Sequence, residues 1–347
     1  MLRTLIRLSD GREISSGVNE SMNIRSCTTT QCCNSGDDLT IGSVCAACVE
    51  MVVEAPDNTF RSDDVFTLYK VDETGTRTQI GVFNVFEPRR KGKHLWQVTA
   101  YDNVIKLDTD LSDWLLENIA SLSDPRSFVY EVCRQCGVVF SDKGFYFDDD
   151  IHRIPYFEPN GPVTGRKLLQ WIGEMCGYFC IADAYGNICF KWYSAARVDL
   201  SETDKWVRFQ GGCKFNNHIM PCDGVRLIFG TDSRQFPFRT LNNPYIIKDN
   251  PILQCWKDSG WTAVAELLAK KFEELDELCT LGEGYLAACE AAVQSTNEIE
   301  VGDIVIFDRQ SPTEDGENTP YISMLVMTKK TFGQRCVIKC TGSYRRN

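Results

Sequence analysis

The chain has 347 residues, a formal net charge of −11, and ordinary shares of hydrophobic (43%) and charged (24%) residues. This length fits two or three domains, and the composition is typical of a soluble globular chain. It lacks an apolar run long enough for a membrane-spanning helix, and a broad phosphate-binding surface would need the opposite sign of charge. Only a local basic patch would be compatible with nucleic-acid binding.

The N-terminal part is expected to consist of β-strands. Leu2–Leu8 alternates between apolar and polar residues, and its regularly spaced charges are not those of a secretory signal. Asp37–Asp102 alternates over much of its length, which is typical of half-buried antiparallel strands. Asp72–Gly75 is expected to form a hairpin turn and Glu87–Lys93 a charged hairpin loop, because Gly and Pro interrupt the pattern there. The stretch predicts a β-meander that closes into a barrel or curls strongly.

Helical periodicity begins after residue 110. Ser127–Gly137 has apolar residues at helical spacing and ends in Gly. Thr164–Gly177 is the clearest helix, because Thr164 can cap its N-terminus and Gly177 can end it in a left-handed conformation. Tyr178–Trp192 then predicts a hairpin with Gly186 and Asn187 in its turn. A generic α+β unit would have the same order of elements.

From residue 207 onward the pattern returns to strands, including Gly224–Gly230 and Ile299–Phe307, with a helix predicted over Trp261–Cys279. Near the C-terminus, strand Leu325–Met327, a basic turn and strand Cys336–Cys340 repeat the order of elements in residues 82–100. The sequence identity of these two segments is too low to prove a duplication. The shared order nevertheless fits a chain that carries two similar barrels.

The chain contains 17 cysteines, many at apolar positions. Because free cysteine behaves as a small buried hydrophobe, we interpret most of them as reduced core residues of a protein made in a cytoplasmic, anaerobic setting. Two Cys-x-x-Cys pairs, Cys45/Cys48 and Cys133/Cys136, have the spacing of zinc ligands. Cys133/Cys136 is the better candidate because it ends a predicted helix, whereas Cys45 and Cys48 are expected on opposite faces of a strand. Three more cysteines fall in a polar stretch that is expected to be a loop: Cys27, Cys32 and Cys33.

Other candidate residues carry no recognisable motif. The acidic run Asp148–Asp150 lacks the spacing, central Gly and terminal Glu of a calcium-binding EF-hand loop, so we interpret it as a solvated loop. The histidines, His94, His152 and His218, are interpreted as surface or satisfied core residues. Since nucleophile elbows, phosphate-binding loops and metalloprotease motifs are missing from the sequence, we assign no catalytic, metal or cofactor residue and expect no enzyme.

Two segments resemble the tail hub (baseplate hub) proteins of tailed bacteriophages and related contractile injection machines. The first is the order Ile41-Gly42-Ser43, a long strand, Gly81–Val85, a basic turn and Val98–Asp108; the second is the helix and hairpin of residues 164–192. The resemblance implies an α+β, mainly β fold with two tube-protein-like β-barrels and an intervening α/β domain. We expect the first barrel in residues 1–110, the α/β domain in 111–200, and the second barrel, with the inserted helix at 261–279, in 201–347.

The same resemblance implies a structural, homotrimeric adaptor that joins the hexameric tail tube to the central tip or spike. A trimer with two barrels per chain would present six barrels to the tube. The implied partners are the tail tube, tip or spike, tape measure and other baseplate proteins, while DNA passes through without being specifically bound. The implied location is the virion tail, assembled in the host cytoplasm. A tail-associated hydrolase of peptidoglycan or polysaccharide and an acidic protein-binding adaptor remain as alternatives, although a fused lysin would need more chain beyond the barrels.

Overall fold

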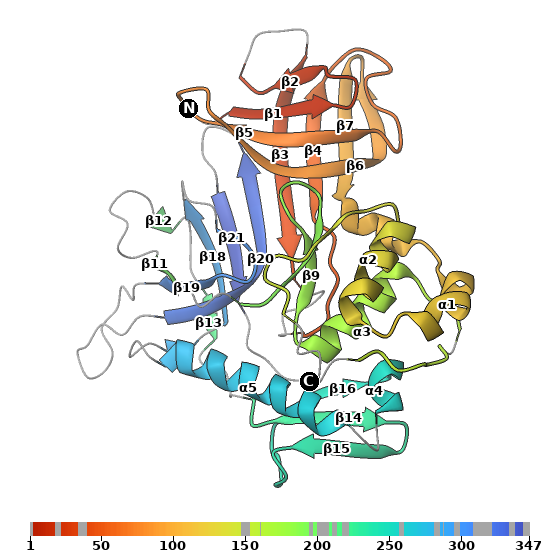
Figure 1. Cartoon of the computed structure of the whole chain (residues 1–347). Coiled ribbons are helices and arrows are strands. Elements are labelled where there is room, and N and C mark those ends of the chain that lie inside the picture. The colour runs from red at the N-terminus through yellow and green to blue at the C-terminus, as the bar shows by residue number, and fades with distance from the viewer. Residues whose placement is uncertain are drawn as a thin grey trace, which may run out of the picture.

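The structure is a computed structural model and is built mainly of β-strands with few helices (Figure 1). It describes residues 3–17, 22–33, 40–146, 153–159, 161–193, 197–199, 208–209, 214–216, 222–256, 260–280, 285–286, 288–294, 299–307, 321–332 and 337–342.

Seven strands in the described N-terminal part close a β-barrel. They follow one another around the ring in the order β3-β2-β1-β5-β6-β7-β4, and β4 pairs back onto β3. Alternate side chains of each strand point inward, as in β7, where Val98 and Ala100 are buried and their neighbours are half-exposed. The strands are β1 (Arg3–Leu8), β2 (Glu13–Ser15), β3 (Asn23–Cys32), β4 (Cys48–Glu54), β5 (Val65–Val71), β6 (Arg77–Gly92) and β7 (Leu95–Asp102).

The predicted turn at Asp72–Gly75 is confirmed, but the predicted loop at Glu87–Lys93 is wrong. Gly75 has φ +89°, and the Asp72 carboxylate accepts hydrogen bonds from the turn. In contrast, β6 continues to Gly92 and pairs with β7 along this segment. Pro88 is tolerated there because β5 pairs with β6 only as far as Asn84, which leaves this part of β6 at a sheet edge. The strands are instead joined by a tight turn.

The chain leaves the barrel through a 3₁₀ helix, η1 (Asn103–Asp108), and forms the predicted helical unit. Thr164 caps α3 by accepting a hydrogen bond from the Lys167 amide, and Gly177 ends the helix at φ +75°. The predicted hairpin is also present, and a short strand, β8, joins it in parallel. The elements are α1 (Ser112–Asn118), η2 (Ile119–Ser121), α2 (Pro125–Gln135), β8 (Phe140–Ser141), α3 (Gly165–Cys176), β9 (Phe179–Ala182) and β10 (Ile188–Lys191).

The predicted helix at 261–279 is confirmed as α5 (Trp261–Thr280). It packs on β14 and β15, two strands of a separate three-stranded sheet. This sheet has the order β15-β14-β16 and lies with α5 at the lower end of the molecule in Figure 1. Of the helices in the described part of the chain, none combines the length and apolar character needed to cross a bilayer. The other elements here are β14 (Val225–Phe229), β15 (Asp232–Phe236), β16 (Tyr245–Lys248) and α4 (Pro251–Cys255).

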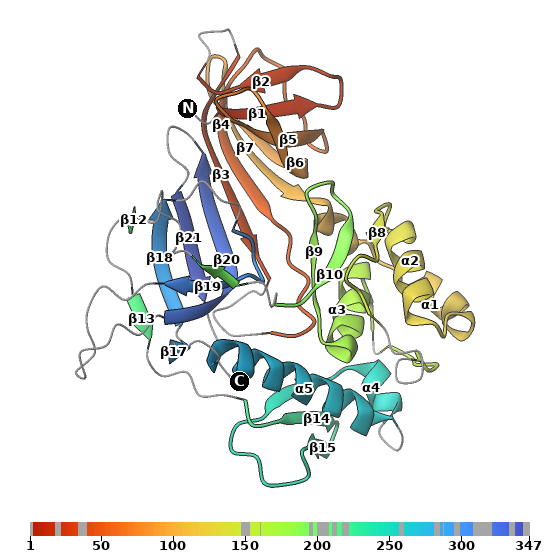
Figure 2. The ribbon, with the colours of Figure 1, turned by 60° about the vertical axis from the view of Figure 1, so that its left-hand side comes forward.

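The remaining strands form a C-terminal sheet that is continuous with the barrel. β20 pairs with β3 from Met327 opposite Cys32 to Phe332 opposite Cys27, and Figure 2 shows β20, β21 and β18 side by side next to β3. Among the described residues these strands do not close a second ring. They are β11 (Arg197–Asp199), β12 (Arg208–Phe209), β13 (Lys214–Asn216), β17 (Tyr285–Leu286), β18 (Ala288–Gln294), β19 (Ile304–Phe307), β20 (Tyr321–Phe332) and β21 (Val337–Gly342).

Candidate functional site

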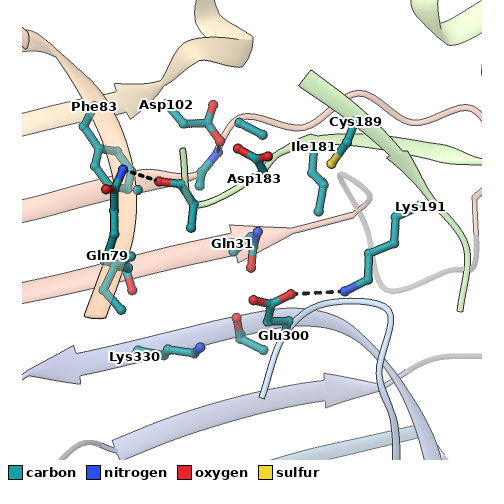
Figure 3. Close-up of a pocket in the computed structure, with 17 residues that line it drawn as sticks. Gln31, Gln79, Phe83, Asp102, Ile181, Asp183, Cys189, Lys191, Glu300 and Lys330 are labelled. Carbon is teal, nitrogen blue, oxygen red and sulfur yellow. Dashed lines mark hydrogen bonds and ion pairs between the residues drawn. The ribbon is translucent and has the colours of Figure 1, made fainter. Parts of the chain in front are cut away.

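A pocket of about 240 Å³, lined by both apolar and charged side chains, lies where the barrel, the β9–β10 hairpin and the C-terminal sheet meet (Figure 3). Its floor comes from β3 and β20, where Gln31 pairs with Thr328 and Thr29 with Lys330. These four residues share one sheet face, because alternate residues of a strand point the same way. The pocket therefore depends on the pairing of two strands that are far apart in the sequence. Across the same pair of strands, the hydroxyl oxygens of Thr28 and Thr331, 303 residues apart, lie 3.3 Å from each other.

The β9–β10 turn is held against the barrel by two hydrogen bonds. Gln79 Nε2 on β6 donates to the Ala184 main-chain oxygen at 2.8 Å, and Asn103 Nδ2 donates to the Gly186 oxygen at 2.7 Å. Asp183 shapes the turn itself, since its carboxylate accepts hydrogen bonds from the amides of Tyr185 and Asn187. The turn is thus built locally and then fixed to the barrel by side chains from other elements.

An ion pair crosses the opposite wall of the pocket. Lys191 Nζ on β10 lies 3.2 Å from a Glu300 carboxylate oxygen and 3.9 Å from Asp303. Burial raises the pKa of Asp303 above its usual value, although Lys191 acts in the other direction. Because both carboxylates and lysines line the pocket, its chemistry favours neither an anionic nor a cationic ligand. The pair instead ties the hairpin to the start of the β19 region.

Asp102 is the most deeply buried carboxyl group of the pocket. Its two oxygens accept hydrogen bonds from the amides of Ala47 and Val104, at 2.9 and 3.0 Å. Desolvation raises the pKa of this carboxyl to about 7, and the two backbone hydrogen bonds oppose that shift. Both oxygens already hold the end of β7 to neighbouring backbone, so we assign Asp102 a structural role at the barrel exit.

The two Cys-x-x-Cys pairs do not assemble into a shared metal site. Cys133 and Cys136 are buried against the core, and desolvation raises the pKa of their thiols to about 12 and about 11. This disfavours the thiolates that zinc requires. Cys45 lies before β4 rather than within it, so it does not share a strand with Cys48 as predicted. Across the described residues, His, Cys, Asp and Glu side chains do not gather in groups of three or more that could hold a metal ion.

The remaining candidates are scattered. His94 occupies the tight turn between β6 and β7 with φ +61°, instead of opening the strand, and its side chain is half-exposed 4.0 Å from Asp57. His152, His218 and Asp148–Asp150 lie outside the described residues. The predicted loop cysteines are in fact part of β3 or directly follow it. The sequence reasoning missed the pocket residues, because their placement depends on the pairing of β3 with β20.

The surface of the described part carries several large apolar side chains that a monomer would leave in water. Tyr146 is 80% exposed, and Val139 and Tyr130 are exposed near the edge of the sheet at β8. Such side chains are more often found where a protein meets a partner, although single exposed residues are common. The others are Phe86, Leu116, Tyr156, Tyr185 and Phe238.

The fold is shared with tail proteins of known structure. The chain is similar to the tail protein from Neisseria meningitidis MC58 (TM-score 0.56, 12% identity, covering 99% of this chain and 96% of that one). It is also similar to the 43 kDa tail protein of prophage MuSo2 from Shewanella oneidensis (TM-score 0.53, 12% identity, covering 98% of this chain and 97% of that one). A third similar structure is prophage tail protein gp18 from Listeria monocytogenes EGD-e (TM-score 0.52, 12% identity, covering 99% of this chain and 95% of that one). No protein-family model and no curated protein sequence matches the chain.

Each match covers nearly the whole of this chain and nearly the whole of the matched protein. All three proteins are described as tail proteins. The resemblance indicated by the sequence is therefore confirmed in the fold. The chain has the fold of phage tail proteins.

Proposed function

We propose that this chain is a structural, non-enzymatic hub protein of a phage tail or related contractile injection machine, and that it joins the tail tube to the central tip or spike as a homotrimer. The observation that carries the proposal is the match in fold to three tail proteins, each over at least 98% of this chain. The proposed location is the tail tip or baseplate of the virion. The proposed neighbours are the tube, tip, tape measure and other baseplate proteins.

The proposal retains two tube-protein-like barrels, in residues 1–110 and 201–347, on either side of an α/β domain in 111–200. The seven-strand ring supports the first barrel. Support for the second comes from two comparable hairpins, β6–β7 and β20–β21. In both hairpins, the pairing register of the two strands shifts directly after a buried apolar residue of the long first strand. This residue is Val85 in β6 and Leu325 in β20.

The continuous sheet gives this arrangement a mechanical basis. Because β20 pairs with β3 over six residue pairs, the barrel and the C-terminal sheet are joined by main-chain hydrogen bonds as well as by the covalent chain. A rigid spacing of two barrels within each chain is what a threefold hub needs if six barrels are to meet a sixfold tube. Closed symmetric assembly is the common state of such chains.

The net charge of −11 supports a role in which DNA passes the hub without being bound. A bore lined by acidic side chains would repel phosphates, whereas phosphate binding needs Lys and Arg. In this proposal the oligomer bore carries a negative potential. An assembled ring whose lumen is lined by Lys and Arg would contradict this part of the proposal.

The test is binding of the purified chain to tail tubes assembled from the tube protein of the same tail. We expect the chain to bind at tube ends, in a ratio of three chains to each terminal six-subunit ring, as measured by electron microscopy of labelled chain and by quantitative sedimentation. Binding along the whole tube, or an absence of binding to tubes and to the tip protein alike, would contradict the proposal. A chain denatured and left unfolded serves as the control for nonspecific sedimentation.

A further inference from the structure

The charged side chains of the pocket between the barrel, the β9–β10 hairpin and the C-terminal sheet are engaged with other groups of the protein. The Lys191 ammonium lies 3.2 Å from a Glu300 carboxylate oxygen. The carboxylates of Asp183 and Asp102 accept hydrogen bonds from backbone amides. Lys330 has an interaction partner as well. A charged ligand would therefore have to displace existing partners of these groups before it could pair with them.

The floor of the pocket, by contrast, carries neutral side chains that lack hydrogen-bond partners. Within the part of the chain that the structure describes, the side chains of Thr29, Gln31 and Thr328 make no hydrogen bond, although all three line the pocket. They lie together, because Gln31 is opposite Thr328 and shares one face of β3 with Thr29. Figure 3 shows Gln31 in the middle of the pocket. Since Thr29 and Thr328 are only 7% and 1% exposed, and a buried hydroxyl without a partner costs free energy, a molecule in the pocket that supplies these hydrogen bonds is favoured.

Apolar side chains line the same pocket beside this floor. They are Ile80 and Phe83 from the barrel strand β6 and Ile181 from β9. The Phe83 ring is fixed by its stack on Phe66, with ring centroids 5.8 Å apart. The pocket volume of about 240 Å³ is just below the roughly 300–1,000 Å³ typical of sites for drug-sized ligands. The pocket therefore suits one small ring that has both hydrogen-bonding groups and an apolar face.

We propose that this pocket binds a single uncharged sugar ring, a neutral pyranose. The hydroxyls of such a ring both donate and accept hydrogen bonds, which matches the Gln31 amide and the hydroxyls of Thr29 and Thr328. The C–H face of the ring would lie against the apolar side chains of β6 and β9. A charge on the sugar would lose its hydration without gaining an unpaired counter-charge, so the site disfavours acidic and basic sugars. The proposal does not rest on the hub function, and either can fail without the other.

The experiment measures binding of D-glucose, D-galactose and D-mannose to the purified chain by saturation-transfer NMR and titration calorimetry. Each sugar that binds is then compared with its uronate and its 2-amino-2-deoxy analogue, which carry a negative and a positive charge. We expect at least one neutral sugar to bind weakly and its charged analogues to bind about tenfold more weakly still. A disaccharide with the same sugar at its non-reducing end separates two sources of ligand. Retained binding indicates the end of a glycan and lost binding a free sugar, and either result supports the site.

Gln31→Leu tests where the sugar binds. The variant keeps a side chain of similar size but removes its hydrogen-bonding groups, so the Kd should rise about tenfold. Gln254→Leu is the control and should bind as the wild type does, because Gln254 is exposed and lies on α4. Unchanged binding by a folded Gln31→Leu variant would overturn the proposal.

The comparison of neutral with charged sugars is made in the wild-type chain and does not depend on whether a variant folds. The proposal is wrong if none of the neutral sugars binds. It is equally wrong if a charged analogue binds as tightly as its neutral parent, because the charged groups of the pocket would then be open to a ligand.

Discussion

Gln79 on β6 donates a 2.8 Å hydrogen bond to the main-chain oxygen of Ala184, in the turn between β9 and β10. The two residues belong to the barrel and to the hairpin of the α/β unit, so the bond crosses the joint between them. Asn103 makes a second bond across the same joint, to the oxygen of Gly186. These two hydrogen bonds add to the buried apolar contacts that hold the α/β unit at the exit of the barrel.

Gln79→Ala is expected to loosen this joint. The Ala184 oxygen would lose its donor at a half-buried site, which costs about 1 kcal/mol of unfolding free energy. Urea denaturation should show the loss, and hydrogen exchange should show faster exchange at the amides of Gly186 and Asn187. The exposed helix residue Gln254 provides the control, since Gln254→Ala should leave both quantities unchanged. Equal effects of the two substitutions would contradict a role for Gln79 in the joint.

Gly186→Ala is expected to be more damaging than the same change at another turn. Gly186 has φ +81°, and an added Cβ would lie 2.7 Å from Asn103 Nδ2 and 3.1 Å from Val82 Cβ. Backbone strain and displacement of the barrel contact should together lower stability by about 2–3 kcal/mol. Gly75 also has a positive φ, +89°, but an added Cβ there meets nothing within 4 Å. Gly75→Ala should therefore lose only about 1 kcal/mol, and equal losses would argue against close packing at Gly186.

Stability should fall as the pH rises from about 4.5 to 7.5. Burial raises the pKa of Glu174 and of Asp102 to about 7 in the folded chain. A carboxyl group whose pKa is higher in the folded than in the unfolded chain binds its proton more tightly in the folded chain. It therefore stabilises the folded chain at pH values below its unfolded-state pKa, and this stabilisation is lost as the pH rises through the folded-state pKa. Urea denaturation at both ends of this range should show a decrease on the order of a few kcal/mol.

Glu174→Gln tests one source of that slope. Glu174 accepts hydrogen bonds from Gln170 and from Asn250, so the variant should be weaker at low pH by about 1 kcal/mol because one donor loses its acceptor. Its stability should depend less on pH than that of the wild type. Glu266→Gln, on the exposed side of α5, is the control and should keep the wild-type slope. A Glu174→Gln slope equal to the wild-type slope would contradict the burial argument.

Cys133 is expected to act as a core residue. Cys133 lies on α2 and is completely buried. Cys133→Ala should therefore lower the free energy of unfolding by about 1 kcal/mol, and Cys133→Ser should lower it further, because a hydroxyl group would be buried there. A chelator should leave the Tm of the wild type unchanged. Equal, severe losses in both variants, together with unfolding by chelator, would instead indicate a metal ligand.

Local signals in the sequence predict the α/β unit well. Thr164 and Gly177 mark the two ends of α3, and Gly186 and Asn187 mark the turn of the hairpin, since each signal depends on residues close together in the chain. The segment Glu87–Lys93 misled the prediction because its Pro and charges are typical of loops, yet they also suit an edge strand that pairs on one side only.

Features that depend on distant pairing could not be predicted in this way. Nothing in β3 or β20 alone indicates that Gln31 lies opposite Thr328, and this register creates both the pocket floor and the continuous sheet. Periodicity predicts which residues are buried in a strand, but it does not specify the neighbouring strand.

The central claim, a trimeric structural hub, is tested most directly by the solution mass of the purified chain. Each chain has a mass of 39.3 kDa, so light scattering during gel filtration should give three times that mass, either for the chain alone or once the tip protein is added. The mass should not change with chelator. A chain that remains a monomer across concentrations and in the presence of tube and tip proteins would contradict the account.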